Sequence, residues 1–275
     1  MDYRVSDKQI DFYRENGFVQ LEDVVTPQEL EELREAMEEV MAEDGELAFG
    51  RVKGSAYYNV LNQKVNTWRD SASMARFTLH SRFANMALQL TGADGIRLFH
   101  DHGLWKMPQD SKPTPWHQDM PYWPMKEPGA LSMWLTLDDV DENNGCMMFV
   151  PGAHRLGKLQ GINFTEPQNL FDYVEGQATN QPVMVPMKAG SCTFHHGLTF
   201  HYAHANRTGP PAPGACGDLH ARRYDLPVAQ RIERACRDEA VSVPGRRSAA
   251  GKAVSGSGAK MNCTGNNRQK YTGLE

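Results

Sequence analysis

The amino-acid sequence predicts a mainly β protein: an antiparallel β-sandwich or jelly roll with flanking α-helices packed outside it. Two observations predict this class. The first 45 residues have the apolar period and the capping residues of helices, and from residue 95 short apolar or alternating runs are separated by turn formers. Short strands at close spacing after a helical start are typical of such folds. The 275 residues, 40% hydrophobic and 23% charged, are enough to bury a substantial core.

Two helices are expected near the amino terminus. Ser6 is predicted to cap a helix over residues 7–16, which ends before Gly17. The stretch TPQE at residues 26–29 has capping-box spacing and a proline at the first helical position, so a second helix is expected to begin there. Its apolar residues share one face, which suits a helix packed against a larger body: Leu30, Leu33 and Met37.

The rest of the chain is predicted to supply the strands of the sandwich. Turn formers such as DENNG, PGAH and KAGS separate the runs. The runs are IRLFHDHGLWKM (96–107), LSMWLTLDDV (131–140), CMMFVPG (146–152), PVMVPM (182–187) and SCTFHHGLTFHYAH (191–204).

Composition and missing motifs argue against several classes of function. A net charge of −5 gives no reason to expect a nucleic-acid partner. No apolar run approaches the roughly 18–20 residues that span a membrane, and the first residues lack the apolar core of a signal peptide. Five cysteines without C-x-x-C spacing predict free thiols in a reduced, cytoplasmic protein. The sequence contains no glycine-rich phosphate loop, G-x-S-x-G or H-E-x-x-H motif.

The stretch TPWHQD at residues 114–119 suggests a metal site. If it forms a strand, His117 and Asp119 point to the same face, about 7 Å apart along the chain. An imidazole and a carboxylate in that arrangement suit one metal ion. Two histidines and one carboxylate, with the other positions open, form the iron site of non-haem Fe(II) oxygenases. A zinc hydrolase with the same three ligands is the alternative.

The third ligand is expected among the four histidines of residues 195–204. Strand alternation separates His195 from His196, so at most one of them points inward. His201 follows the turn-like Gly197 and begins the next strand, which a sandwich would bring back beside the first two ligands. We favour His201, although spacing alone leaves His195, His196 and His204 open.

The chain resembles the phytanoyl-CoA dioxygenase family, which includes the ectoine hydroxylases. The resemblance lies in YRENGFVQLEDVVTPQELEELREAM, WHQDMPYWP, LSMWLTLDDVDENNGCMMFVPGAHR and HHGLTFHYAHAN, and runs from about residue 8 to 211. It implies a double-stranded β-helix in which His117, Asp119 and His201 bind Fe(II). The implied reaction uses 2-oxoglutarate and O2 to hydroxylate a C–H bond of a small-molecule substrate and releases succinate and CO2.

The same resemblance implies residues that bind 2-oxoglutarate. Trp134 matches a position that lines the cosubstrate pocket, and His102 and Lys106 lie in the preceding strand, which often contributes to it. Ala203 is a departure, because many family members have a serine there that helps to hold the cosubstrate. The family pattern also places an arginine eleven residues after the distal histidine, at position 212, to pair with the far carboxylate. This chain has Ala212.

Residues 212–275 depart from the family in other ways. They contain no Phe or Trp, and eleven Lys and Arg against six Asp and Glu, a net charge of 11 − 6 = +5. We therefore expect a dioxygenase-like domain over residues 1–211 and a poorly ordered basic tail over residues 212–275, with the last core strand missing.

A frameshift is one hypothesis for this departure. Residues 212–226 can be back-translated so that reading one base later yields RRALAVIYMPDGTTY, which resembles the arginine and last strand of the family. The alternative is a natural divergence in which Arg207 or Arg222 holds the cosubstrate. A family member that lacks this arginine could also be catalytically impaired and act as a ligand-binding or structural module.

Overall fold

The computed structural model describes residues 3–42, 62–106, 112–125, 129–166, 169–174, 180–209 and 212–221, the last of these by its backbone. They lie within one compact unit, residues 1–231. The α-helices are α1 (Asp7–Asn16), α2 (Pro27–Ala42), α4 (Thr67–Asp70), α5 (Ala72–Thr78) and α6 (Ser81–Thr91), and the short 3₁₀ helices are η1 (Met120–Tyr122), η2 (Ala153–Leu156) and η3 (Leu170–Val174). The strands are β1 (Phe18–Leu21), β2 (Asn62–Val65), β3 (Ile96–Lys106), β4 (Thr114–His117), β5 (Ala130–Thr136), β6 (Met147–Phe149), β7 (Val183–Val185), β8 (Cys192–His196), β9 (His201–Ala203) and β10 (Ala212–Ala221). Within the described ranges, no helix has the length and apolar character needed to cross a membrane.

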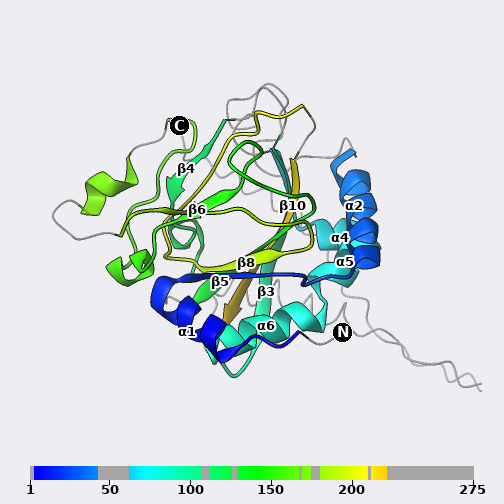
Figure 1. The fold of residues 1–275 in the computed structure, drawn as a ribbon, viewed down its shortest axis with the longest axis horizontal. Coiled ribbons are helices and arrows are strands. Elements are labelled where there is room, and N and C mark those ends of the chain that lie inside the picture. The colour runs from blue at the N-terminus through cyan, green and yellow to red at the C-terminus, as the bar shows by residue number, and fades with distance from the viewer. Residues whose placement is uncertain are drawn as a thin grey trace, which may run out of the picture. The chain divides into compact units, whose positions relative to one another are not determined.

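The described strands form two antiparallel sheets (Figure 1). The larger has the order β1-β8-β5-β10-β3-β2, and the smaller has the order β4-β9-β6-β7. The sheets pack together through a cluster of apolar residues between them. In this cluster the rings of Phe18 and Phe149, one from each sheet, stack with their centroids 4.6 Å apart. The predicted jelly roll is confirmed.

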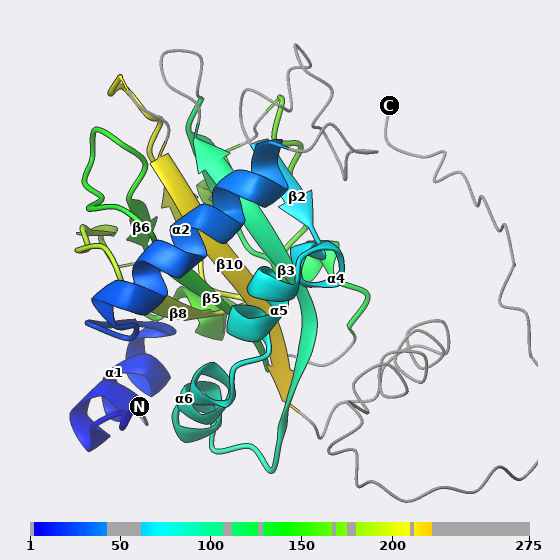
Figure 2. The same ribbon diagram turned by 90° about the vertical axis from the view of Figure 1, so that its right-hand side faces the viewer.

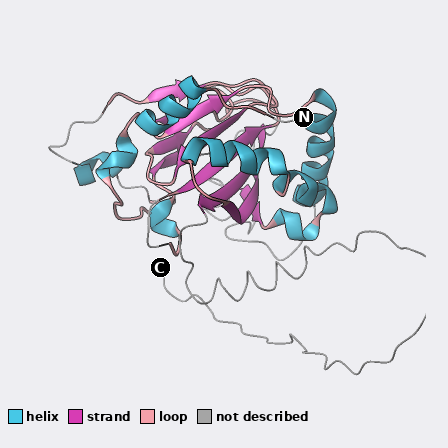
Figure 3. Ribbon diagram, turned by 90° about the horizontal axis from the view of Figure 1, so that it is seen from below, coloured by secondary structure: helices cyan, strands magenta, loops and turns pink. Residues whose placement is uncertain are grey.

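Strand alternation gives the larger sheet two different faces. Leu131 and Leu135 of β5 lie in a core shared with the helices. Trp134, on the opposite face of the same strand, packs against the cluster between the sheets. Helices α2, α5 and α6 lie over the outer face of the larger sheet (Figures 2 and 3). The inner face is therefore left for residues of the functional site.

The predicted helix caps are confirmed. The Ser6 hydroxyl accepts a hydrogen bond from the backbone N–H of Gln9, and Gly17 ends α1 with a φ of 81°. At the start of α2, Thr26 and Glu29 form the reciprocal pair of a capping box, with distances of 2.8 and 3.2 Å. These local bonds set where each helix begins.

Helix α2 is fixed to its neighbours by a close contact and an ion pair. A Cβ atom at Gly103 of β3 would lie 2.8 Å from Sδ of Met37, so glycine allows the helix to approach the sheet. The guanidinium of Arg82, in α6, is only 4% exposed; it donates to both carboxylate oxygens of Glu29 and to the carbonyl oxygen of Val24. This ion pair joins α2 to α6.

The expectation that the last core strand is missing is wrong. Residues 212–221 form β10, which lies between β3 and β5 and pairs with both. This strand was not predicted because no apolar period marks it. A strand between two others is held by hydrogen bonds of its backbone N–H and C=O groups on both sides. Residues 222–275, the rest of the expected tail, lie outside the described residues.

Candidate metal centre

Two neighbouring strands of the smaller sheet bring the two candidate imidazole ligands together. In the register of β4 and β9, His117 lies opposite His201, and their ring centroids are 4.0 Å apart. Both side chains are buried. The prediction that a strand begins at His201, beyond the turn at Gly197, is confirmed.

Asp119 lies close to both histidines, although not for the reason expected. Strand β4 ends at His117, and Asp119 has a φ of −78° and a ψ of −39° at the start of η1. The expectation that His117 and Asp119 share one strand is therefore wrong. The chain turns here because Met120 donates its backbone N–H to Gly197 and Pro121 has no N–H for a ladder.

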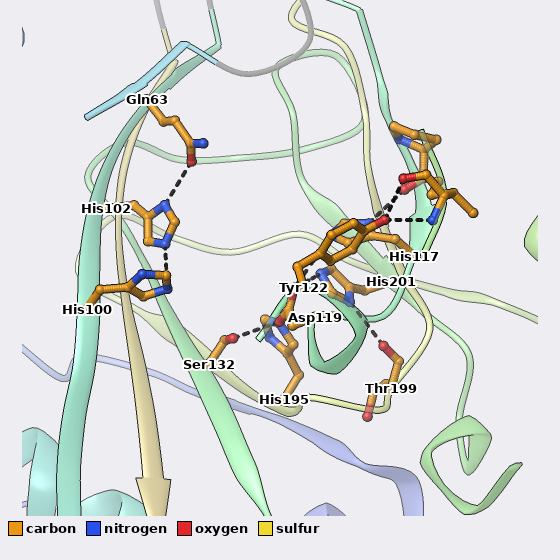
Figure 4. Close-up of polar contacts among 12 residues, drawn as sticks. Gln63, His100, His102, His117, Asp119, Tyr122, Ser132, His195, Thr199 and His201 are labelled. Atoms are coloured by element: carbon orange, nitrogen blue, oxygen red, sulfur yellow. Dashed lines mark hydrogen bonds and ion pairs between the residues drawn. The ribbon is translucent and has the colours of Figure 1, made fainter. Parts of the chain in front are cut away.

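The three candidate ligand atoms converge on one point. Nε2 of His117 is 3.6 Å and Nε2 of His201 is 3.4 Å from Oδ1 of Asp119. Within the described part of the chain these residues form a group whose ligand atoms all lie within 4.8 Å of one another. Figure 4 shows the three side chains turned toward a common centre.

Hydrogen bonds to the backbone set the protonation of both imidazoles. Nδ1 of His117 is 2.8 Å from the carbonyl oxygen of Pro115, and Nδ1 of His201 is 3.0 Å from that of Thr199. A carbonyl oxygen only accepts, so the network assigns the proton to Nδ1 in each ring and leaves a lone pair on Nε2. Two nitrogen lone pairs and a carboxylate oxygen then face one another, an arrangement that favours a cation among them.

The electrostatics agree with this assignment. Burial, together with the neighbouring His117, lowers the pKa of His201 well below its ordinary value, which keeps the ring neutral. Burial alone would raise the pKa of Asp119, but the surrounding imidazoles outweigh it and hold that pKa well below its ordinary value. A neutral imidazole and an ionised carboxylate are the forms that bind a divalent metal ion.

The second oxygen of Asp119 is held by the larger sheet. The Ser132 hydroxyl donates to Oδ2 at 2.8 Å, and Nε2 of His195 is 3.2 Å from the same atom (Figure 4). Ser132 and His195 are paired directly across β5 and β8. This leaves Oδ1 directed toward His117 and His201.

The other histidines considered as ligands have different surroundings. His195 points inward, as alternation allows for one of the pair, but it contacts Asp119 and lies outside the three-residue group. His196 accepts a hydrogen bond from the backbone N–H of Leu198, and the ring of His204 lies against Tyr202. Sequence reasoning missed Ser132 as a partner of Asp119, because nothing in the sequence indicates which strand lies opposite η1.

The three residues expected at the cosubstrate lie on the inner face of the larger sheet, in different surroundings. Trp134 packs against the apolar cluster between the sheets. Nδ1 of His102 is 2.8 Å from Oε1 of Gln63, and its Nε2 is 3.0 Å from Nε2 of His100. Figure 4 shows this row of three side chains across from Ser132 and Asp119. Lys106, at the end of β3, reaches the smaller sheet at β4.

Hydrogen bonds hold the loop that follows η2 beside the three candidate ligands. Gln118, between His117 and Asp119, is buried and donates to the carbonyl oxygens of Gly157 and Leu198, and its own oxygen accepts from Leu159. The Tyr122 hydroxyl bonds both the N–H and the C=O of Ile162 at 2.8 Å.

Aromatic rings from this loop then complete one side of the centre. Phe164 stacks on Tyr122, and its ring centroid lies 4.8 Å from that of His117. The segment around Ile162 and Phe164 thus lies beside the candidate metal centre.

Comparison with known proteins gives one family. The sequence matches the family described as phytanoyl-CoA dioxygenase (PhyH) over residues 13–214. The peroxisomal phytanoyl-CoA dioxygenase of Mus musculus is 24% identical over 214 residues, which cover 72% of this chain and 63% of the mouse protein. This chain thus spans less than two thirds of that relative's length. The ectoine dioxygenase of Nocardia farcinica is 28% identical over 156 residues, 55% of this chain and 52% of that protein.

Solved structures agree with the family. The non-haem α-ketoglutarate-dependent carbocyclase SnoK, from nogalamycin biosynthesis, has a TM-score of 0.71 and 26% identity, over 84% of this chain and 90% of SnoK. The epimerase SnoN, in complex with Fe3+, α-ketoglutarate and nogalamycin RO, has a TM-score of 0.68 and 26% identity, over 91% of this chain and 95% of SnoN. With a family match over most of the chain and a fold and histidine–carboxylate cluster that agree with it, this chain belongs to the phytanoyl-CoA dioxygenase family.

Proposed function

We propose that this chain is a non-haem Fe(II)- and 2-oxoglutarate-dependent dioxygenase that hydroxylates a C–H bond of a small molecule and releases succinate and CO2. The observation that carries the proposal is the arrangement of His117, Asp119 and His201. Two Nε2 lone pairs and one carboxylate oxygen face one another in a buried place. Three protein ligands with the remaining positions open are what such iron chemistry requires.

In this proposal the chain's own residues hold and orient the reactants. His117, Asp119 and His201 hold the iron, and Ser132 and His195 fix the carboxylate of Asp119 through its other oxygen. When bound, the iron would activate O2, and the decarboxylation of the keto acid would supply the electrons for this step. The loop fastened by Gln118 and Tyr122 covers the side of His117 and limits the access of water.

We further propose that the cosubstrate lies between the two sheets, against Trp134, His102 and Lys106. These three residues lie on the inner face of the larger sheet, which supports the proposal. Strand β5 of the same sheet carries Ser132, whose hydroxyl donates to Asp119. The names of the similar proteins mention phytanoyl-CoA, ectoine and nogalamycin RO. These are all small molecules, and we assign the substrate of this chain to that class alone.

Iron binding and succinate release test the proposal together. Anaerobic dialysis should find one tightly bound Fe(II) per chain, and admission of air with 2-oxoglutarate should release succinate. His201→Ala should abolish both. His204→Ala is the matched control, because His204 lies outside the ligand group, and it should retain both. Equal iron binding by His201→Ala would overturn the proposal, and Zn(II)-dependent hydrolysis without succinate would favour the zinc alternative.

A second candidate function is a catalytically impaired family member that binds a ligand without turning it over. One specific observation favours it, namely that position 212 is alanine rather than the arginine of the family pattern. Iron binding without any succinate from 2-oxoglutarate would support this candidate over the first.

A further inference from the structure

We propose that Lys106 takes the place of the absent arginine and binds the distal carboxylate of 2-oxoglutarate. This inference rests on the proposed function and assigns one contact in the same site.

The first support is the backbone register at the end of the larger sheet. Ala212, the first residue of β10, is paired directly with Lys106, the last residue of β3. Lys106 is therefore the direct backbone partner of the position that the family pattern gives to arginine, one strand away in the same sheet.

The second support is the direction of the Lys106 side chain. Gly103 and Trp105 of β3 face the helices, since a Cβ at Gly103 would meet Met37 and Trp105 packs against the helix-side core. Lys106 is on the other face and extends between the sheets. Its stem passes Gly145, where an added Cβ would lie 3.3 Å from Cγ of Lys106. Glycine there leaves the lysine room.

The third support is where the ammonium group ends. Nζ of Lys106 donates to the Thr114 hydroxyl at 2.8 Å and to the carbonyl oxygen of Lys112 at 3.2 Å. Thr114 is buried, begins β4 and is paired with Ala203 of β9. His117 is three residues further along the same strand, about 10 Å by strand rise. The ammonium group thus lies at the start of the short strand that ends at the candidate ligand His117.

The fourth support is charge. Of the carboxylates that the structure describes, none pairs with Lys106; its partners are a hydroxyl and a carbonyl. Burial lowers the pKa of Lys106 to about 7, because it removes hydration that favours the charged ammonium. A carboxylate ligand would supply that compensation, with the Thr114 hydroxyl as a second donor.

The alternative cations are less well placed. The side chain of Arg207 is exposed, and its backbone N–H is bonded to Asn143 at the surface turn. Arg222 lies outside the described residues. The backbone of Lys106, by contrast, is held in place by a 2.9 Å hydrogen bond from the Asn206 side chain to its carbonyl oxygen.

Anaerobic calorimetry of the Fe(II)-loaded full chain tests the inference. The probes are 2-oxoglutarate and 2-oxobutyrate, a keto acid without the distal carboxylate. Lys106→Met should weaken 2-oxoglutarate binding at least ~10-fold, the scale of a lost charge-assisted hydrogen bond. The same variant should leave the affinities for 2-oxobutyrate and Fe(II) within about 2-fold. Lys106→Arg should keep most of the 2-oxoglutarate affinity, and Ala212→Arg should restore it in the Lys106→Met background.

The outcomes separate this inference from the function on which it rests. Lys188→Met is the matched control, because that lysine is exposed and pairs with Asp139 on an outer turn. If Lys106→Met binds 2-oxoglutarate as tightly as the unaltered chain, Lys106 is not the anchor, and the proposed function stands. If the unaltered Fe(II)-loaded chain binds neither keto acid, the proposed function and this inference both fail.

Discussion

The Ser132 hydroxyl donates a 2.8 Å hydrogen bond to Oδ2 of Asp119, the oxygen that is turned away from His117 and His201. A carboxylate held in this way has one oxygen occupied by the protein and the other directed at the two imidazoles. Ser132 is therefore a positioning residue for the carboxylate of Asp119. Its removal should act mainly on the affinity for Fe(II).

Removing this hydroxyl should weaken iron binding. We expect Ser132→Ala to lower the Fe(II) affinity about 10-fold, because loss of a partner of a metal-binding side chain typically costs 10–100-fold. Competition with a chelator under anaerobic conditions measures it. Ser191→Ala is the matched control, since the buried Ser191 hydroxyl has no hydrogen-bond partner in the described structure. A Ser132→Ala variant with the affinity of the control would contradict the positioning role.

His195 should behave in the same way through the same oxygen. Its Nε2 contacts Asp119, while its buried Nδ1 has no partner among the described residues. His195→Phe should lower Fe(II) affinity by about 10-fold without lowering the melting temperature. His195→Gln, which can keep a donor near Oδ2, should recover most of the affinity. Failure of glutamine to recover any affinity would count against hydrogen bonding as the cause.

The ion pair between α2 and α6 should make stability depend on pH. Hydrogen bonds from Arg82 above all lower the pKa of Glu29 from 4.5 to about 2. A lowered carboxylate pKa stabilises the fold above pH 4.5, and that stabilisation is lost as the pH falls toward 2. We expect Glu29→Gln to lower the free energy of unfolding at pH 7 by ~1–3 kcal/mol.

Urea unfolding between pH 7 and pH 3 measures this effect. The difference between the unaltered chain and Glu29→Gln should shrink below pH 4.5. Glu31→Gln is the control, because its ion pair with Arg34 is exposed and should matter little. A pH-independent difference would show that packing rather than the charge on Glu29 stabilises the pair.

Strand β10 should be required for folding. A chain ending at residue 211 would leave β3 and β5 without the strand between them, and unpaired strand edges promote aggregation. We expect this shortened chain to be insoluble or to lose cooperative unfolding. A chain ending at residue 231, the end of the compact unit, should unfold cooperatively. Equal stability of the two shortened chains would mean that β10 contributes nothing.

Local sequence signals predicted much of the fold. The caps at Ser6 and Thr26 are made by residues three apart in the chain, so the sequence contains both partners. Alternation in β5 and β8 similarly predicts which residues face the interior. Strand β10 was missed because its pairing uses backbone groups, for which residue types are a weak signal.

The three residues expected as metal ligands lie together in the structure, but the sequence did not predict how the chain brings them together. The spacing of His117 and Asp119 suggested a shared strand, but the turn into η1 brings Asp119 to the histidines instead. The roles of Ser132 and His195 depend on long-range pairing of β5 with β8, which no local pattern reports. The register of Lys106 opposite Ala212 likewise belongs to the folded chain alone.

The frameshift hypothesis for residues 212–226 concerns the gene. Sequencing across codons 200–230 tests it, since codons that cannot yield RRALAVIYMPDGTTY in the next frame would reject it. If the codons do allow it, Ala212→Arg returns the expected cation to the protein. Our inference about Lys106 predicts that the chain as written already binds 2-oxoglutarate without this change.

The most direct test of the proposed function is an anaerobic titration of the full chain, with Fe(II) first and 2-oxoglutarate second, followed by visible absorption. A keto acid chelated to Fe(II) has a weak visible charge-transfer band. We predict that the band develops with 2-oxoglutarate in the unaltered chain and is absent from His201→Ala. Iron binding with no band in the unaltered chain would contradict the proposed dioxygenase function, and the same band in His201→Ala would contradict a centre built from His117, Asp119 and His201.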